Sequence, residues 1–376
     1  MRKSVIVKKT SRMENKNPMK LKMQGFRDFF FIRKLGLALS SYGNINWNAG
    51  WIIGKTKDVF LSIHMRPKFS KDVKLKSTYK IYSEDLAVIL QGPIGGIEQF
   101  VEETVKLYAV IFEGAKIIVS TWKGVDSKVV SRLESLGAIV ILNDVPNDSG
   151  WWNVDLQTKS TSSAISYAKE KNIKYCLKTR VDFRIYKPNS FAYLKSLLDV
   201  FPINNLNFQK ARLITTSLLT LKYRVYGVTD ILMFGTTYDM ARYWSSENFN
   251  DGLKRCNFGN HPSVINGTPV VTEIFLCARY LHDIGEPLEW SLEHWWEMLR
   301  KYFCVIDADS LDLLETKYDC MYEKRFYKSY TLPSSRSVEF SDWLSLYSEK
   351  DMHWGDLNLK EEWEVRDGNL RKVRIL

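Results

Sequence analysis

The chain has 376 residues, of which 45% are hydrophobic, 13% aromatic and 26% charged. This composition excludes a disordered or collagen-like chain, because it supplies enough apolar side chains for a large core. The five cysteines are odd in number and form no C-x-x-C pair, which excludes a disulfide framework and a zinc knuckle and favours a reducing compartment.

The net charge of +11 comes from one segment of the chain. Residues 1–82 carry 19 Lys and Arg against 4 Asp and Glu, whereas the remainder carries 35 against 39. Within this segment, Met19 to Leu39 interleaves basic residues with Phe, Leu and Met, a pattern typical of helices that contact anionic lipid headgroups. A basic helix docked on the main domain explains the pattern equally well. No motif for binding nucleic acid accompanies the charge, so we expect no nucleic-acid partner.

No stretch of the sequence predicts a membrane span or a secretory signal. Leu35 to Gly54 is uncharged and long enough to cross a bilayer, but its three asparagines, two serines and four glycines disfavour insertion. We therefore predict a cytoplasmic protein that is peripheral at the inner face of the membrane, with residues 1–82 contacting the anionic membrane surface.

From Leu86 the sequence alternates between strand and helix signals. Short apolar runs predict strands, and apolar residues at helical spacing predict helices between them. Repeated strand–helix units of this kind predict an α/β fold with a mostly parallel central sheet and flanking helices. The predicted strands are 86–91, 116–121, 138–142 and 175–178, and the predicted helices are 97–112, 126–136 and 153–171.

Polar side chains follow all four predicted strands. In a parallel sheet the carboxyl ends of the strands share one edge, which is where such folds bind ligands. Each end alone is explained as well by turn and cap residues, but four together favour a binding site. The residues concerned are Gln91, Gly92 and Pro93, then Ser120, Thr121 and Trp122, then Asn143 and Asp144, and finally Arg180 and Asp182.

Several familiar sites are missing from the sequence. There is no G-x-G-x-x-G, no G-x-x-x-x-G-K-[ST] and no G-x-S-x-G, which disfavours a dinucleotide site, a P-loop and a common hydrolase elbow. The five histidines never fall at metal-binding spacings. The chemistry at the strand ends therefore depends on carboxylates and basic groups.

Asp182 follows the fourth strand and is flanked by basic side chains. A carboxylate at this position is suited to Mg²⁺ or Mn²⁺, which binds carboxylate and phosphate oxygens together. Lys178 and Arg180 are placed to contact phosphate directly, Arg180 through its two-pronged guanidinium. The alternative is an ordinary ion pair at the end of a strand.

The stretch from Val88 to about Tyr280 resembles the WavE lipopolysaccharide-synthesis family, which comprises glycosyltransferases of cell-surface polysaccharide clusters. The resemblance implies a GT-A-like nucleotide-diphospho-sugar transferase fold and a nucleotide-sugar as co-substrate. Its motifs, in order, are ILQGPI (89–94), ETVKLY (103–108), KIIVSTW (116–122), LQTKST (156–161), CLKTRVD (176–182), TDILMFG (229–235) and TEIFL (272–276).

The resemblance also assigns residues to the nucleotide pocket. It implies that Gln91 and Gly92 line the pocket, that Thr121 and Trp122 border it, and that Asp182 stands in the place of a metal-binding D-x-D. Two departures matter. The first acid of the D-x-D is Arg180 here, which puts tight metal dependence in doubt. The family has an arginine where Leu156 stands, which moves phosphate contact from that helix to Lys159.

Two later acids are candidates for the group that deprotonates the acceptor hydroxyl. Asp230 lies among apolar residues that would desolvate it, and we assign it as an acceptor-side or structural acid. Glu273 opens a predicted helix with Thr272 as its N-cap, and we assign it as the catalytic base. The alternative for Glu273 is a first-turn acid favoured by the helix dipole.

The last third of the chain is rich in aromatic residues, including Trp290, Trp295, Trp296, Tyr302 and Trp343. Their helical spacing favours core packing over a platform for sugars. We predict three parts: the basic segment 1–82, a catalytic domain over 83–285, and a C-terminal extension over 286–376 on the acceptor side.

These observations predict a glycosyltransferase that moves a sugar from a nucleotide-sugar donor to a lipid-linked glycan acceptor in lipopolysaccharide, O-antigen or capsule synthesis. Two alternatives remain open. One is transfer of a nucleotide-activated polyol or phosphosugar, which needs the same phosphate-binding edge. The other is a catalytically silent scaffold of a polysaccharide assembly complex.

Overall fold

The computed structural model describes residues 66–74, 82–203, 208–256, 258, 270–316 and 337–348, together with the backbone of 363–366 and 369–372. The chain divides into two compact units, Met1–Arg66 and Pro67–Leu376, and every described strand and helix belongs to the second. The basic stretch from Met19 to Leu39 and the uncharged stretch from Leu35 to Gly54 lie outside the described residues. Among the helices that are described, none combines the length and apolarity needed to cross a bilayer.

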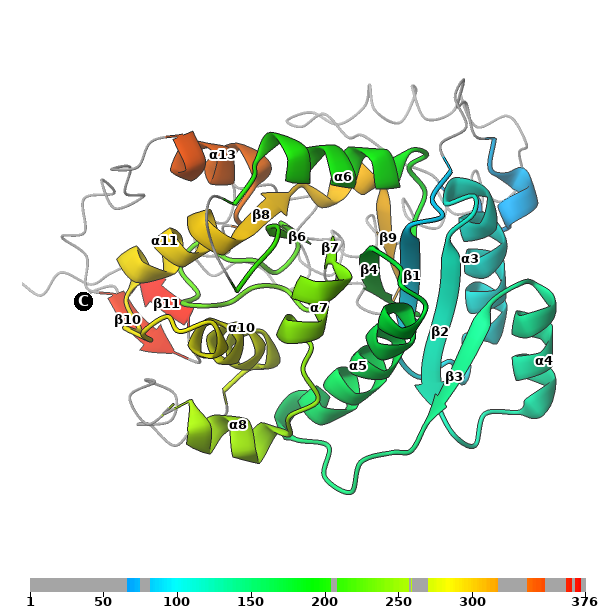
Figure 1. The fold of residues 1–376 in the computed structure, drawn as a ribbon, viewed down its shortest axis with the longest axis horizontal. Helices are drawn as coiled ribbons and strands as arrows, with labels where there is room; N and C mark the ends of the chain where they lie inside the picture. The colour runs from blue at the N-terminus through cyan, green and yellow to red at the C-terminus, as the bar shows by residue number, and fades with distance from the viewer. Residues whose placement is uncertain are drawn as a thin grey trace, which may run out of the picture. The chain divides into compact units, whose positions relative to one another are not determined.

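A seven-stranded sheet forms the centre of the second unit (Figure 1). Apolar runs without charges make up most of these strands, as expected for strands that are covered on both faces. The strands are β1 (Leu86–Gln91), β2 (Lys116–Trp122), β3 (Ile139–Asn143), β4 (Tyr175–Arg180), β6 (Leu213–Thr216), β7 (Met233–Thr236) and β8 (Phe303–Ile306), in the spatial order β3-β2-β1-β4-β7-β6-β8.

All strand pairs of the sheet are parallel except those that involve β7, which runs antiparallel to both β4 and β6. The predicted α/β fold with a mostly parallel sheet is therefore confirmed. The direction of β7 has a consequence for the site, because the start of β7 lies at the same edge as the carboxyl end of β4. Lys178 pairs with Met233 there.

The first three helices connect the parallel strands. They are α3 (Glu98–Ile111), α4 (Ser127–Ser135) and α5 (Val154–Glu170). Right-handed crossovers place α3 and α4 on one face and α5 on the other, because the chain reverses its direction across the sheet after β3. In Figure 1, α5 lies to the left of β2 and β3, and α3 and α4 lie to their right.

The second half of the chain completes the sheet and adds two small antiparallel pairs. The further helices are α6 (Ser190–Val200), α7 (Thr237–Tyr243), α8 (Phe249–Arg255), α10 (Thr272–Asp283), α11 (Leu292–Tyr302) and α13 (Phe340–Ser348). The small sheets pair β5 (Phe183–Ile185) with β9 (Leu313–Glu315) and β10 (Trp363–Arg366) with β11 (Asn369–Lys372). The main sheet thus continues past residue 285, because β8 pairs with β6.

The aromatic residues of the last third are largely core residues, as their spacing predicted. Trp295, Tyr302 and Trp343 have no exposed surface, and Trp296 is also buried. The side chains of Trp354 and Trp363 lie outside the described residues. One local prediction was wrong: the N-cap of α10 is Val271, and Thr272 is its first helical residue, with a buried hydroxyl that lacks a hydrogen-bond partner.

Candidate active site

The ends of β1 and β4 meet at one edge of the sheet. Gln91 lies opposite Arg180 in the register of the two strands, and opposite Ser120 of β2 on its other side. The pairing continues beyond the strand, because the Val181 N–H donates to the Gln91 carbonyl at 3.1 Å and the Gly92 N–H to the Ser120 carbonyl at 3.1 Å. Three segments that are distant in sequence are thereby fixed against one another.

Gly92 allows this close approach. Its φ is +132°, a conformation that L-residues rarely adopt, and a Cβ placed on it would lie 3.1 Å from Cγ2 of Val181. Val181 stands between Arg180 and Asp182, so a side chain at Gly92 would press on the segment that carries both. Pro93 follows with an exposed ring.

The side chain of Gln91 is almost fully buried, yet its carboxamide makes no hydrogen bond to any described residue. A buried amide normally has a partner, because leaving it unpaired costs about 1–3 kcal/mol. Its neighbour on β2, Thr121, is fully buried and its hydroxyl also lacks a partner. Trp122 at the end of β2 is only partly covered. The edge at β1 therefore presents polar groups that a ligand can satisfy.

Two of the predicted strand-end residues serve the scaffold instead. The Asn143 side-chain amide donates to Ser120 Oγ at 2.9 Å and to the Thr121 carbonyl at 2.8 Å. Ser120 in turn donates to the Ser160 carbonyl at 2.7 Å. These bonds tie β2, β3 and α5 together, and they occupy the polar groups that the sequence pattern had grouped with the ligand edge.

Arg180 and Asp182 form a two-pronged ion pair at this edge. Nε of Arg180 donates to one carboxylate oxygen at 2.9 Å and Nη2 to the other at 2.8 Å. Their side chains keep 18% and 12% of their surface exposed, so the pair is recessed but not sealed. Because both oxygens of Asp182 accept from Arg180, this carboxylate already has a cationic partner where the Mg²⁺ or Mn²⁺ was predicted. The metal site stays a prediction.

Lys178 lies beneath this ion pair and has no exposed surface. Its ammonium donates to the backbone carbonyl of Asp230 and lies 4.5 Å from the ring centroid of Trp244. Burial lowers the pKa of Lys178 to about 8, and the charge of Asp230 opposes that shift. Lys178 is thus a buried charge behind the edge, with no surface for direct contact with phosphate in this conformation.

Asp230, from the second half of the chain, also lies at this edge of the sheet, next to Lys178. It stands just before β7, whose start lies beside the end of β4. Its side chain is buried, but its carboxylate accepts no hydrogen bond from the described residues. The carboxylate is therefore available to a ligand at this edge.

Glu273 approaches Asp230 from the first turn of α10. Burial raises the pKa of Glu273, and the negative charge of Asp230 raises it further, while Arg224 and Arg180 oppose the shift. One carboxylate oxygen lies 3.4 Å from Nη1 of Arg224, and 15% of the side chain is exposed. Glu273 of α10 is thus close enough to interact electrostatically with Asp230 before β7 and with Arg180 of β4.

Arg224 was missed by the sequence analysis. It lies in the connection between β6 and β7, where no strand end, helix start or motif marks it. Its role becomes visible only from its contact with Glu273, 49 residues later in the chain. No signal in the sequence alone identifies such a long-range pair.

Lys159 lies apart from the residues of this edge. The structure places it on α5, in the lining of a cavity of about 650 Å³ beyond the end of β3. Four aspartates share that lining, so the surroundings of Lys159 are acidic. The predicted contact between Lys159 and a nucleotide phosphate stays a prediction.

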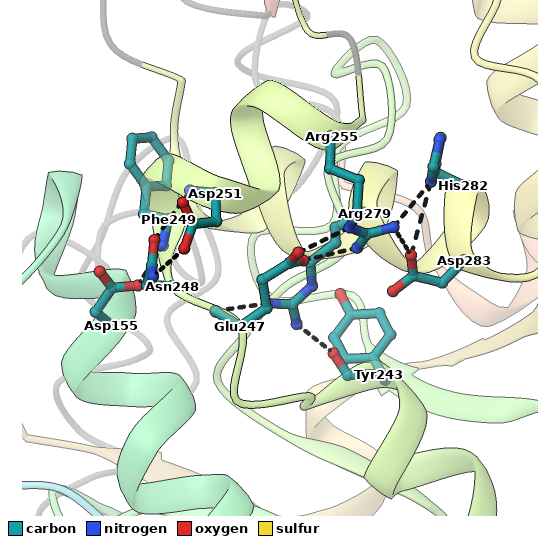
Figure 2. Close-up of polar contacts among 10 residues, drawn as sticks. All are labelled: Asp155, Tyr243, Glu247, Asn248, Phe249, Asp251, Arg255, Arg279, His282 and Asp283. Atoms are coloured by element: carbon teal, nitrogen blue, oxygen red, sulfur yellow. Dashed lines mark hydrogen bonds and ion pairs between the residues drawn. The ribbon is translucent and has the colours of Figure 1, made fainter.

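A second polar cluster joins α8 to α10 (Figure 2). Arg255 pairs with Glu247 at 2.6 Å and with Asp283 at 2.5 Å, and its guanidinium contacts Nδ1 of His282 at 3.2 Å. Cys256, His282 and Asp283 are also close enough to one another to share a metal ion. Because the guanidinium already occupies Asp283 and His282, we interpret this cluster as an ion-pair network that fastens two helices.

The family model described as WavE lipopolysaccharide synthesis matches residues 86–361. No curated protein matches the sequence significantly. Similar solved structures include a cytidylyltransferase from Leptospira borgpetersenii, with 11% identity, coverage of 71% of this chain and 94% of that chain, and a TM-score of 0.32. Another is HddC from Yersinia pseudotuberculosis, with 13% identity, coverage of 45% and 82%, and a TM-score of 0.28. At such low TM-scores neither likeness bears on the activity of this chain.

Proposed function

This chain belongs to the WavE lipopolysaccharide-synthesis family, and on that premise we propose that it is a glycosyltransferase with a GT-A-like fold. It moves a sugar from a nucleotide-sugar donor to a lipid-linked glycan acceptor. The role in lipopolysaccharide synthesis follows from the family, whereas sugar transfer is argued from the site.

The observation that carries the proposal is the pair of buried, unpartnered polar side chains at one edge of the sheet. Gln91 and Asp230 keep only 5% and 6% of their surface exposed, and no described residue hydrogen-bonds to either side chain. Gln91 ends β1 in the parallel part of the sheet, and Asp230 stands just before the antiparallel strand β7. Recessed polar groups that the protein leaves unbonded are suited to a ligand. A binding edge built from both halves suits a donor held by one half and an acceptor by the other.

The donor side centres on β1 and β4. The leaving nucleoside diphosphate gains negative charge as the glycosidic bond breaks, so a fixed cation beside it lowers the barrier. Arg180 supplies such a cation, and Asp182 holds its guanidinium in one orientation through two bonds. The carboxamide of Gln91 is placed to donate to or accept from the nucleotide.

The acceptor side centres on Glu273. A base that removes a proton from a sugar hydroxyl works best when its own pKa is raised, because a raised pKa makes the carboxylate a stronger base. Burial and Asp230 provide that increase in the pKa of Glu273, and Arg224 holds the carboxylate in place. Asp230 lies between the two sides and is suited to bind an acceptor hydroxyl.

We further propose that the enzyme acts at the inner face of the cytoplasmic membrane, where a lipid-linked acceptor is available. The basic character of residues 1–82 supports this placement. The absence of a membrane-spanning helix among the described residues is compatible with peripheral association.

The proposal is tested by incubating the protein with UDP-, GDP-, CMP- and dTDP-sugars, with and without Mn²⁺. We expect one nucleotide class to raise the melting temperature and its sugar to be slowly hydrolysed. Stabilisation by a nucleotide with no hydrolysis of any sugar would move the assignment to transfer of an activated polyol or phosphosugar. If no nucleotide stabilises the protein, the catalytic proposal fails and the scaffold remains.

A further inference from the structure

A cavity of about 650 Å³ opens at the carboxyl end of β3, next to the candidate active site. Its lining combines four aspartates, three asparagines, a serine and a threonine with the single cation Lys159. The cavity begins at Asp144, directly after β3. Two strand spacings separate β3 from β1, so the cavity lies on the order of 10 Å from the end of β1 along the same edge.

Asp155 is the most deeply placed of the four aspartates. It lies on the first turn of α5, and one of its carboxylate oxygens accepts from the Phe249 N–H of α8 at 2.7 Å (Figure 2). No described residue donates to the other oxygen, although only 6% of the residue's surface is exposed. Burial raises the pKa of this carboxyl, as expected where donors are missing. The cavity therefore holds an acceptor oxygen that the described residues leave available to a ligand.

The polar side chains around Asp155 are already ordered by bonds among themselves. Asn250 donates to Asp148 at 3.1 Å, and Asn248 donates to Asp251 at 2.5 Å. Each carboxylate accepts several hydrogen bonds, so all of them keep capacity for further donors. Held in place in this way, they form a set of acceptors and amides that matches the hydroxyl groups of a sugar.

Exposed apolar side chains flank the cavity. Of the nine exposed large hydrophobic residues in the described chain, one lies near the end of β3 and three in the connection from β3 to α5: Leu142, and then Val145, Trp151 and Trp152. The ring of Trp151 packs against Phe249 at 5.6 Å between centroids and still exposes 46% of its surface. Trp152 exposes 63%. Exposed indoles beside a polar cavity are typical of surfaces that bind a partly apolar, partly hydroxylated ligand.

The charge of the lining decides between ligand classes. Lys159 is the one cation among the described residues of the lining, and Lys123 pairs with Asp144 at 2.7 Å, so the four carboxylates face two ammonium groups. This excess of negative charge disfavours a pyrophosphate, a phosphosugar or an acidic sugar, whereas an uncharged polyol meets no such penalty. The nucleotide end of the donor is therefore disfavoured in this cavity.

We propose that this cavity, with Trp151 nearby on Phe249, binds uncharged sugar units of the acceptor glycan. Hydroxyl groups donate to Asp155 and its polar neighbours while the carbon face of a ring stacks on an indole. The identification of this saccharide as the acceptor rests on the proposed glycosyl transfer, but the saccharide site itself does not.

The experiment uses the full chain on an array printed with neutral and acidic bacterial surface oligosaccharides, followed by fluorescence titration of the best neutral binder. Trp151→Ala and Asp155→Asn are each expected to weaken binding about tenfold, the value of one stacking contact or one charged hydrogen bond. Asn at position 155 keeps an oxygen for the Phe249 N–H, so the fold is retained. Matched controls are Tyr82→Ala and Asp199→Asn, exposed residues outside the cavity lining, which should bind as the wild type does.

The proposal is overturned if no neutral oligosaccharide binds, if only acidic ones bind, or if the cavity variants bind like the wild type. It is also overturned if the cavity variants abolish a thermal shift with Ca²⁺ alone while no oligosaccharide binds. Donor hydrolysis measured on the same variants separates the two proposals. If no glycan binds but a donor is hydrolysed, only the proposed saccharide site is refuted. If a glycan binds but no donor is hydrolysed, only the proposed glycosyl transfer is refuted.

Discussion

At the scale of single residues, Asp230 and Asp239 show how differently this fold treats two buried carboxylates. Asp239 accepts from the backbone N–H groups of Lys210 and Ala211 and from the hydroxyl of Thr236. Asp230 is equally enclosed but accepts nothing from the described residues. A fully bonded carboxylate stabilises the fold, whereas an unpaired one costs stability and is retained where it meets a ligand. The chemistry is therefore expected around Asp230.

Glu273 gives the first prediction. Glu273→Gln should lower kcat about 10²–10⁴-fold and leave donor affinity unchanged, because the amide cannot accept the proton. The base works only when deprotonated, and its pKa is raised, so the acidic limb of kcat/KM should lie above the ordinary value of 4.5. Steady-state kinetics over pH measures both effects.

The matched control is Glu293→Gln, which removes another exposed glutamate from the first turn of a helix, α11. If both variants behave alike, or if Glu273→Gln reduces only donor affinity, Glu273 is a helix-dipole residue and the base is Asp230.

Arg180 and Asp182 give the second prediction. Because Arg180 occupies both oxygens of Asp182, chelation with EDTA should lower turnover less than about tenfold, whereas Arg180→Gln should lower it about 10²–10³-fold. Asp182→Ala should also abolish turnover, since the guanidinium loses its orientation. The exposed Arg132→Gln on α4 serves as the control. Complete loss of activity in EDTA, restored by Mn²⁺, would contradict this assignment.

Lys178 gives a prediction for stability. Its pKa falls from 10.5 to about 8 on folding, so between these values the unfolded chain binds more protons than the folded one. The stability contributed by this residue should therefore rise with pH over that window, by up to about 3 kcal/mol. Urea unfolding at pH 7.5 and 10.5 should show this rise in the wild type and lose it in Lys178→Met. Lys195→Met, on the exposed side of α6, should keep the wild-type profile; identical profiles for all three proteins would refute the assignment.

At the scale of elements, the end of β1 determines how the site is assembled. The chain leaves β1 at Gly92 with a positive φ and passes beside Val181, which directly follows β4. On the other face of the sheet, the start of α5 places Asp155 against α8. Each of these contacts joins elements that are neighbours in space and distant in sequence.

Gly92→Ala should therefore destabilise the protein by about 1–3 kcal/mol, because an L-residue at this φ is strained and its Cβ presses on Val181. The same variant should weaken stabilisation by the nucleotide, since Val181 separates Arg180 from Asp182. Gly95→Ala is the matched control, because a Cβ there meets no atom within 4 Å. Equal melting temperatures and equal nucleotide shifts for the two variants would show that β1 ends without constraint.

At the scale of the whole molecule, charge is distributed unevenly along the chain. The excess of basic residues lies in residues 1–82, while the remainder is slightly acidic. The cavity beyond β3 lies in the slightly acidic part of the chain, and four aspartates line it. A chain of this kind is expected to contact an anionic membrane through its basic segment.

Deleting Met1 to Leu39 should release the protein from vesicles of phosphatidylglycerol and leave its activity on a soluble acceptor unchanged. The reason is electrostatic, so wild-type binding should also weaken as salt is raised. Co-sedimentation with phosphatidylglycerol and with phosphatidylcholine vesicles measures the effect. Unchanged binding after the deletion would assign membrane contact to another part of the chain.

The strands β1 to β4 could be predicted almost to the residue, because uninterrupted apolar runs between turn signals have few other solutions. The direction of β7 could not, since the four residues Met233–Thr236 carry no mark of orientation. Asn143 and Lys159 illustrate the same limit at the site. Both stand where a ligand contact is expected, but Asn143 bonds to its own scaffold and Lys159 lines an acidic cavity.

By itself the sequence determined the α/β class, the family and the candidate residues, because periodicity and short motifs are local properties of the chain. Only the tertiary structure decided which candidates lie together. The enclosure of Lys178 and the approach of Glu273 to Asp230 both depend on contacts between segments that are distant along the chain. The physical reason is that burial and charge interactions are set by distance in space, which separation along the chain does not specify.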